Sequence, residues 1–133
     1  MAKLIVNGEN AILGRAGSYI AKQLLKGDSV IFINCEKLMV SGRKELFVER
    51  IRQKRRMGSG GSMKGPKYPR VADRLVKRMI RGMLPRDRMK GQDAFRRLKC
   101  YVGNPDEAKD VIKLTHKKPM KFSTIKEIVR ILK

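Results

Sequence analysis

The chain of 133 residues is strongly basic: it has 33 lysine or arginine residues, 12 aspartate or glutamate residues and a formal net charge of +21. This length suits one domain, and the repulsion within so positive a chain favours a polyanionic partner, with nucleic acid as the first candidate. The longest apolar run has four residues (30–33) and the N-terminus lacks the basic-then-apolar order of a signal peptide. We therefore expect a soluble intracellular protein and exclude a membrane-spanning one.

The N-terminal part of the chain predicts a strand, a helix and a second strand. Residues 4–6 are apolar and precede an Asn-Gly turn signal, and apolar residues recur at helical spacing over 14–26. Gly27 stands where a helix C-cap glycine belongs. The run 30–33 is β-branched and aromatic throughout, which is typical of a strand buried on both faces in a parallel sheet. Together these elements predict a βαβ unit.

Three polar residues, 34–36, follow this second strand, at the position where open α/β sheets place their ligand sites. The sequence supplies no nucleophile, second carboxylate or base at a recognisable spacing from them. We interpret the cluster as turn chemistry and expect no enzyme.

The middle of the chain concentrates the positive charge. Residues 43–90 contain 17 lysine or arginine residues and 4 aspartate or glutamate residues. Residues 38–40 predict a short extended piece, and 43–56 predict a helix with a thin apolar side and a strongly basic end. Residues 57–69 contain four glycines, two prolines and no acidic residue. They predict a flexible arm, either a plain linker or a segment that orders on a phosphate backbone.

The stretch 64–85 predicts an amphipathic helix with a protein face and an anion-binding face. On a helical projection the basic side chains form one stripe, namely Arg70, Arg74, Lys77, Arg78 and Arg81. The apolar residues lie opposite, namely Val71, Leu75, Val76, Met79, Ile80 and Met83. Pro69 suits the first turn, and Gly82 and Pro85 are stop signals.

The C-terminal part predicts a short helix over 92–97 and a strand over 98–102 that ends at a Gly-Asn-Pro turn. Residues 111–114 contain too few apolar positions to assign. Thr124 and Glu127 have the spacing of a capping box, and the apolar residues after Thr124 recur helically, which predicts a C-terminal helix.

Two local patterns could carry other chemistry. Cys35, Cys100 and His116 complete no metal-binding spacing, so we expect no metal site and no cofactor, and we interpret the cysteines as buried apolar residues.

The segment ILGRAGSYI (12–20) is similar to the Gly-x-x-Gly loop with which KH domains clamp single-stranded nucleic acid. Close helix packing, with one phosphate contact from Arg15, is the interpretation that we favour.

A longer resemblance covers most of residues 5–104. The run IRGMLPRDRMKGQDAFRRLKCYVGN (80–104) closely resembles the signature region of the large-subunit ribosomal protein L-thirteen family. Residues 13–27 and 30–42 look like the N-terminal helix of that family and its following strand and loop. Gly17 and Cys100 stand where an alanine and an aliphatic residue are expected, and both are small, apolar-compatible changes. The short C-terminus looks most like an archaeal member.

This resemblance implies an α/β fold, a three-layer α/β/α single domain over residues 1–133 with a four-stranded, mainly parallel sheet. It also implies a structural constituent of the large ribosomal subunit that binds ribosomal RNA, acts early in assembly and resides on the cytoplasmic ribosome. The implied partners are large-subunit ribosomal RNA and neighbouring ribosomal proteins, with no membrane, small-molecule substrate or catalysis.

The charge pattern supplies a mechanism, in which basic side chains over about residues 43–97 neutralise phosphates and hold RNA by shape and backbone. The candidate RNA-binding residues are Arg15, Arg50, Arg52, Lys54, Arg55, Arg56, Lys64, Lys67, Tyr68, Arg70, Arg74, Lys77, Arg78, Arg81, Arg86, Lys90, Arg96 and Arg97. Tyr68 either stacks on a base or braces the loop, and we favour bracing.

Three alternatives stay open from the residues alone. A KH-like regulator would use Gly14 and Gly17 to bind short single strands. A DNA-compaction protein would bind duplex DNA as well as RNA. A nucleotide-dependent enzyme would bind nucleotide saturably, although the chain has no Walker-type loop.

The composition of residues 57–69 predicts mobility in the free protein and order on RNA. Limited proteolysis should therefore cut first within this segment, and bound ribosomal RNA should slow that cut. Equal cutting rates with and without RNA would show that the segment does not order on RNA.

Overall fold

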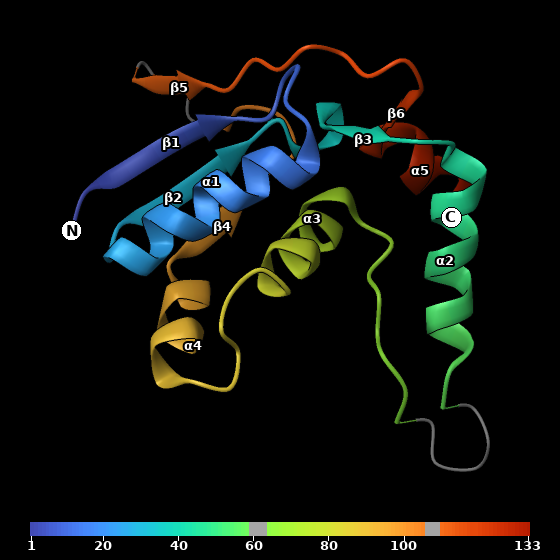
Figure 1. Cartoon of the computed structure of the whole chain (residues 1–133), viewed down its shortest axis with the longest axis horizontal. Coiled ribbons are helices and arrows are strands. Elements are labelled where there is room, and N and C mark those ends of the chain that lie inside the picture. Colours follow the sequence, from blue (N-terminus) through green and yellow to red (C-terminus); the bar gives the residue numbers. More distant parts are fainter. Residues whose placement is uncertain (59–63, 106–109) are drawn as a thin grey trace.

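The computed structural model describes residues 1–58, 64–105 and 110–133, and these ranges form two sheets and five α-helices (Figure 1). The strands are β1 (Lys3–Asn7), β2 (Ser29–Ile33), β3 (Met39–Ser41), β4 (Leu98–Cys100), β5 (Val111–Lys113) and β6 (Phe122–Thr124). The α-helices are α1 (Leu13–Lys26), α2 (Lys44–Arg56), α3 (Ala72–Arg81), α4 (Met89–Arg96) and α5 (Ile125–Leu132), and a 3-10 turn, η1 (Cys35–Lys37), follows β2.

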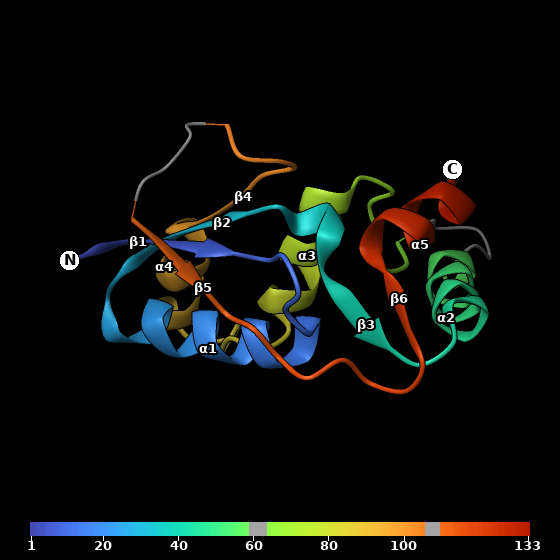
Figure 2. The same cartoon turned by 90° about the horizontal axis from the view of Figure 1, so that it is seen from above.

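The main sheet has the order β4-β2-β1-β5, and all of its pairings are parallel. Its register aligns Leu4 with Val30 and Leu98, and these side chains therefore share one face. Val6 and Phe32 are also aligned, lie on the same face and are fully buried. Helix α1 covers this face and contacts both α3 and α4 (Figure 2). The predicted α/β class with a four-stranded, mainly parallel sheet is confirmed.

Strand β2 is less enclosed than the sequence predicts. Val30, Phe32 and Ile33 are buried, but Ile31, which pairs with Ile5 of β1, is half-buried. The prediction that this strand is buried on both faces is therefore wrong at Ile31. The reason is that α1, α3 and α4 cover the face of the sheet to which Phe32 belongs, whereas Ile31 lies on the other face.

Helix α1 begins and ends close to the predicted residues. Gly27 follows it with φ of +113°, a left-handed conformation that favours glycine, and its N–H bonds to the last carbonyls of the helix. A Cβ on Gly17 would lie 2.8 Å from the Met83 Sδ atom, so the chain after α3 packs directly on α1 at this glycine. At the other end, the backbone N–H of Ile12 donates to His116 Nδ1 at 3.2 Å.

Helix α3 is shorter than the predicted amphipathic stretch. Val71 is its N-cap residue, so Pro69 precedes the helix and does not form its first turn, and this prediction is wrong. Leu75, Val76 and Ile80 are fully buried, which confirms the predicted apolar face at those positions. Val71 lies outside the helix and is 49% exposed.

Two three-residue strands escaped the sequence analysis because residues 111–113 and 122–124 carry no clear strand pattern. Strand β5 forms one edge of the main sheet, and β6 pairs with β3 in a separate antiparallel ribbon. The predicted capping residue Thr124 accepts a hydrogen bond from the Glu127 N–H at 3.4 Å and begins α5. Helix α4 begins at Met89, three residues before the predicted start.

Helices α2 and α5 pack on each other at the end of the molecule away from β1 (Figures 1 and 2). Val48 and Ile51 of α2 belong to the same hydrophobic core as the sheet residues. In the described ranges, the helices are all too short or too polar to cross a membrane.

The fully buried side of α3 gives a stability prediction. Replacing Leu75 by Ala should lower the free energy of unfolding by about 2 to 5 kcal/mol, because it leaves a cavity in the core. The control is Val71→Ala, which removes an apolar side chain that is half exposed and should change stability by less than about 0.5 kcal/mol. Urea unfolding of both variants measures the difference, and equal losses would contradict the assignment of faces.

Candidate nucleic-acid interface

The basic side chains of α2 and α3 have few acidic partners. In the part of the chain that the structure describes, the ion pairs are Lys37 with Glu9 and Arg96 with Asp93, both at 3.2 Å and both exposed. Neither pair involves α2 or α3. The charge of these two helices is therefore left for an external anion.

Tyr68 lies between α2 and α3 and organises a cation from each. The Arg78 guanidinium lies 4.9 Å from the centre of its ring and the Lys54 ammonium lies 5.4 Å from it. Lys54 Nζ also donates to the Tyr68 hydroxyl at 3.4 Å. The ring itself is half-buried and packs against the core. Tyr68 therefore contacts cations of both helices, and the choice between bracing the loop and stacking on a base stays a prediction.

Phe95 of α4 plays a similar part on the other side of α3. The Lys77 ammonium lies 5.0 Å from its ring centre, and the Arg81 guanidinium lies 5.9 Å from it. Two aromatic rings thus hold four cations from α2 and α3 in place.

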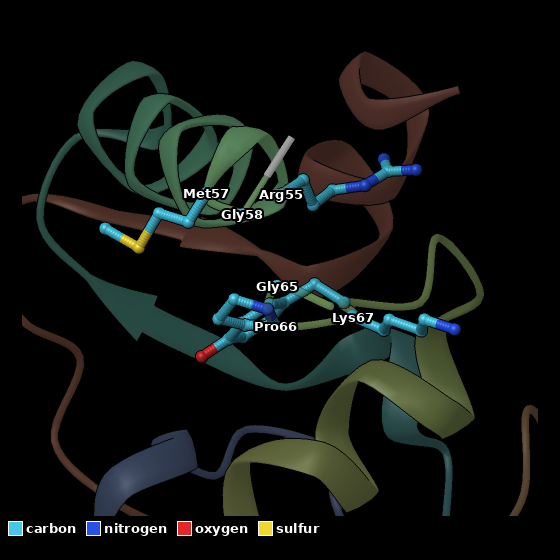
Figure 3. A pocket seen from close by; sticks show the side chains of 7 residues that line it. Arg55, Met57, Gly58, Gly65, Pro66 and Lys67 are labelled. Carbon is cyan, nitrogen blue, oxygen red and sulfur yellow. The ribbon is translucent and has the colours of Figure 1, made fainter. Parts of the chain in front are cut away.

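A first hollow, of about 390 Å³, lies where the two ends of the glycine-rich arm meet, between residues 55–58 and 65–68. A side chain on Gly65 would clash with the Met57 carbonyl oxygen, so these two ends run in close contact. Figure 3 shows Arg55 and Lys67 extending to the same side of this hollow and Met57 extending to the other side. Residues 59–63 of the predicted arm lie outside the described residues, so the mobility of the arm stays a prediction.

A second hollow, of about 440 Å³, lies where α1, α2 and α3 meet, and Tyr68 lines both it and the first. Its cations are Arg50 and Lys54 from α2 and Arg78 from α3. Gly14, at the first turn of α1, lines the same hollow, and a Cβ there would meet no atom within 4 Å.

A third hollow, of about 390 Å³, lies between the end of α3 and α4, and we call it the α3–α4 hollow. It is lined by Arg81, Leu84, Arg86, Gly91, Gln92, Phe95 and Arg96. Arg78 and Arg81 are less than one helical turn apart, so the second hollow and the α3–α4 hollow adjoin the same part of α3.

The structure leaves most predicted site residues accessible. The exposed ones are Arg15, Arg50, Arg52, Lys54, Arg55, Arg56, Lys64, Lys67, Arg70, Arg74, Arg86, Lys90 and Arg96, and the half-buried ones are Tyr68, Lys77, Arg78, Arg81 and Arg97. We call the accessible set on α2, α3, α4 and their connections the basic surface.

Arg97 and Arg52 have contacts within the protein. Arg97 Nη2 donates to the Leu24 carbonyl oxygen at 2.8 Å, which ties the residue after α4 to the end of α1. Arg52 Nη2 donates to the Ile131 carbonyl oxygen at 3.3 Å, across to α5. Arg97 is therefore a structural tie, whereas Arg52 remains exposed on α2.

Sequence reasoning missed several residues that line these hollows. Phe95 and Gln92 line the α3–α4 hollow, and Phe47 lines the second. Lys99 and Tyr101 lie beside Arg74 and Lys77 in a shallower depression of about 250 Å³. The signal that could have identified Phe95 was an aromatic residue next to two arginines in a basic segment.

The Gly-x-x-Gly segment does not form a KH-type loop. Gly14 and Gly17 lie inside helix α1, and Gly17 is buried against Met83. The packing interpretation is therefore confirmed at Gly17 but not at Gly14, where a Cβ would meet no atom, and the phosphate contact from Arg15 stays a prediction. The KH-like alternative is wrong because a helix replaces the loop that would clamp the strand.

The polar residues after β2 are occupied in turn contacts, as predicted. The Asn34 side-chain amide donates to Asn7 Oδ1 at 2.9 Å, and Glu36 Oε2 accepts from the Gly103 N–H at 3.1 Å. Asn34 has φ of +54°, which suits asparagine in a tight turn. These contacts join the ends of β1 and β2 to the loop after β4.

The two cysteines, distant in sequence, are neighbours in the fold. The adjacent Cys100 thiol and the burial of Cys35 raise the pKa of the Cys35 thiol far above its ordinary value, so Cys35 stays protonated. Within the described ranges, the structure contains no group of three or more His, Cys, Asp or Glu residues that could hold a metal ion.

Comparison with known proteins identifies the family. The family model described as ribosomal protein L13 matches residues 2–107. The chain belongs to the ribosomal protein L13 family. Similar proteins named large ribosomal subunit protein uL13 come from Methanosarcina barkeri, 46% identical over 84% of this chain and 79% of that protein, and Methanococcus maripaludis, 39% identical over 97% and 96%. A third, from Methanocaldococcus jannaschii, is 35% identical over 93% of both chains.

The resemblance seen in the sequence is thereby confirmed, and these archaeal relatives are consistent with the archaeal character of the C-terminus. Members of the ribosomal protein L13 family are structural proteins of the large ribosomal subunit and not enzymes. The chain is accordingly a structural ribosomal constituent.

The contact of Arg97 with α1 predicts a stability effect without an effect on RNA binding. Replacing Arg97 by Gln should lower the free energy of unfolding by about 1 to 3 kcal/mol, because a charged hydrogen bond is lost. The control Arg74→Gln removes an exposed cation and should leave stability within about 0.5 kcal/mol. Thermal melts of both variants measure the change in stability. An unchanged melting temperature for Arg97→Gln would show that the hydrogen bond to Leu24 does not stabilise the fold.

Proposed function

We propose that this protein binds large-subunit ribosomal RNA through the basic surface, and that it does so early in the assembly of the subunit in the cytoplasm. The observation that carries the proposal is the gathering of cations from α2, α3 and α4 around three hollows, without acidic partners from the described chain on α2 and α3. Membership of the ribosomal protein L13 family makes ribosomal RNA the polyanion in question.

The contacts are made to the phosphate backbone and to the shape of folded RNA. The basic surface consists of long, exposed cations, and such side chains neutralise phosphates without reading base edges. The hollows between the helices suit a curved or folded RNA surface, which the loops and junctions of RNA provide. Large-subunit proteins that lie beside this RNA are the expected protein neighbours.

Early binding follows from the charge. A compact chain of net charge +21 repels itself until a polyanion neutralises it, so binding to newly made RNA relieves that repulsion. The strong positive field also accelerates the encounter with RNA before other components have covered the phosphates.

A salt titration of RNA binding tests the location of the interface. Replacing Arg55, Arg70 and Arg74 together by Gln should lower the slope of log affinity against log salt by about two to three units, because three phosphate contacts are lost. The fold should remain, since all three side chains are exposed. The measurement uses purified archaeal large-subunit ribosomal RNA, with thermal melts of each variant.

The matched control is the triple change of Lys3, Lys22 and Lys113 to Gln, which removes the same charge from exposed positions outside the basic surface. It should change the slope by less than one unit. Equal slope changes for both triple variants would show general attraction without a localised interface. Equal competition by duplex DNA would favour the DNA-compaction alternative.

A further inference from the structure

The α3–α4 hollow combines an apolar lining with several cations. Leu84, Gly91 and Phe95 provide an apolar floor, and Arg81, Arg86 and Arg96 stand around it. A volume of about 390 Å³ lies within the usual range of small-ligand sites, roughly 300 to 1,000 Å³, and far exceeds what one phosphate group needs.

The hollow is formed by the protein itself and needs no partner to shape it. The Arg88 N–H donates to the Pro85 carbonyl oxygen at 3.3 Å, and the Gly91 N–H donates to the Arg88 carbonyl oxygen at 3.0 Å. A side chain on Gly91 would clash with the Pro85 carbonyl oxygen, so the segment between α3 and α4 lies directly against α4. The Gln92 side chain donates to the Arg86 carbonyl oxygen at 3.5 Å.

The electrostatics of the hollow favour an anion. Partial burial and the nearby cations Arg86 and Arg78 lower the pKa of the Arg81 guanidinium from its ordinary value. Arg96 is paired with Asp93, whereas Arg81 and Arg86 have no ion pair with the described residues. An incoming phosphate would therefore relieve the repulsion between these two arginines.

The aromatic floor distinguishes a nucleotide from other anions. The Arg81 guanidinium lies 5.9 Å from the centre of the Phe95 ring. Unstacked bases in protein–RNA complexes commonly stack on aromatic rings and arginine side chains. A bare phosphate would leave the apolar floor open to water, and a base held within a duplex is not free to enter a hollow. We propose that the α3–α4 hollow receives one unpaired nucleotide of the bound RNA, its base on Phe95 and its phosphate on Arg81 and Arg86.

This inference rests on the proposed RNA binding and specifies one contact within it. The base contact adds affinity that does not depend on salt, because stacking releases no counterions. The phosphate contacts add affinity that depends on salt, because they release counterions. A pair of variants can therefore separate the two halves of the site.

Changing Phe95 to Leu keeps an apolar side chain and removes the ring. It should weaken binding to archaeal large-subunit ribosomal RNA about tenfold and leave the salt slope unchanged. Changing Phe95 to Tyr keeps the ring and should preserve affinity. The matched control is Phe122→Leu. Phe122 also lies beside a lysine, with Lys118 Nζ 6.0 Å from its ring centre, but it is on β6 away from the hollow.

The phosphate contact is tested by changing Arg86 to Gln, which should lower the salt slope by about one unit.

Ultraviolet cross-linking of the wild-type complex, followed by mass spectrometry, locates the base directly. A nucleotide adduct should form on the peptide that contains Phe95 and should be absent when the bound RNA is replaced by a fully double-stranded RNA. If Phe95→Leu proves unstable in a thermal melt, the adduct position and Arg86→Gln decide the question. No adduct near Phe95, together with a parental slope for Arg86→Gln, would overturn this site while wild-type binding remains. Absence of salt-dependent wild-type binding would instead overturn the proposed function.

Discussion

The burial of Leu75, Val76 and Ile80 holds α3 against α1, β4 and α5, and the rest of the basic surface depends on this contact. Apolar burial fixes the axial rotation of the helix, so its cations lie at exposed or half-buried positions on the other side. The same contact positions Arg81 and Leu84, which line the α3–α4 hollow. The core therefore decides where the charge is displayed.

The positive charge of the chain is balanced very little within the described protein, where the ion pairs are Lys37 with Glu9 and Arg96 with Asp93. Surface ion pairs of this kind contribute at most about 1 kcal/mol each, so they cannot offset the repulsion among the cations of α2 and α3. Hydrophobic packing carries the stability of the described protein, and the charge of α2 and α3 is left for the polyanion that we propose it binds.

Two aromatic residues make this surface more ordered than a set of free lysines and arginines. Tyr68 positions Lys54 and Arg78, and Phe95 positions Lys77 and Arg81. Long cationic side chains lose considerable rotamer entropy when they bind, and prior contact with a ring reduces that loss. Arg97 shows a different use of a cation, since its hydrogen bond to the Leu24 carbonyl oxygen joins α4 to α1.

The sequence by itself determined the α/β class, the strand, helix and strand at the N-terminus, the basic character of α2 and α3 and the ribosomal family. These features depend on local periodicity, on charge and on a long motif over residues 80–104, all of which are read along the chain. The buried positions Leu75 and Ile80 were predictable for the same reason. The limits of α3 were not, because Pro69 and Val71 lie outside the helix although their residue types fit its pattern.

Only the tertiary structure decided which residues meet. The three-residue strands β5 and β6 exist because a sheet edge and β3 supply their hydrogen bonds, and so short a segment has no pattern of its own. The proximity of the free thiols of Cys35 and Cys100, the hydrogen bond from Arg97 to Leu24 and the contact of Lys54 with Tyr68 join residues that are distant in sequence. The α3–α4 hollow likewise requires that Gly91 lie against Pro85. Such contacts follow from the packing of whole elements, and a single sequence does not specify that packing.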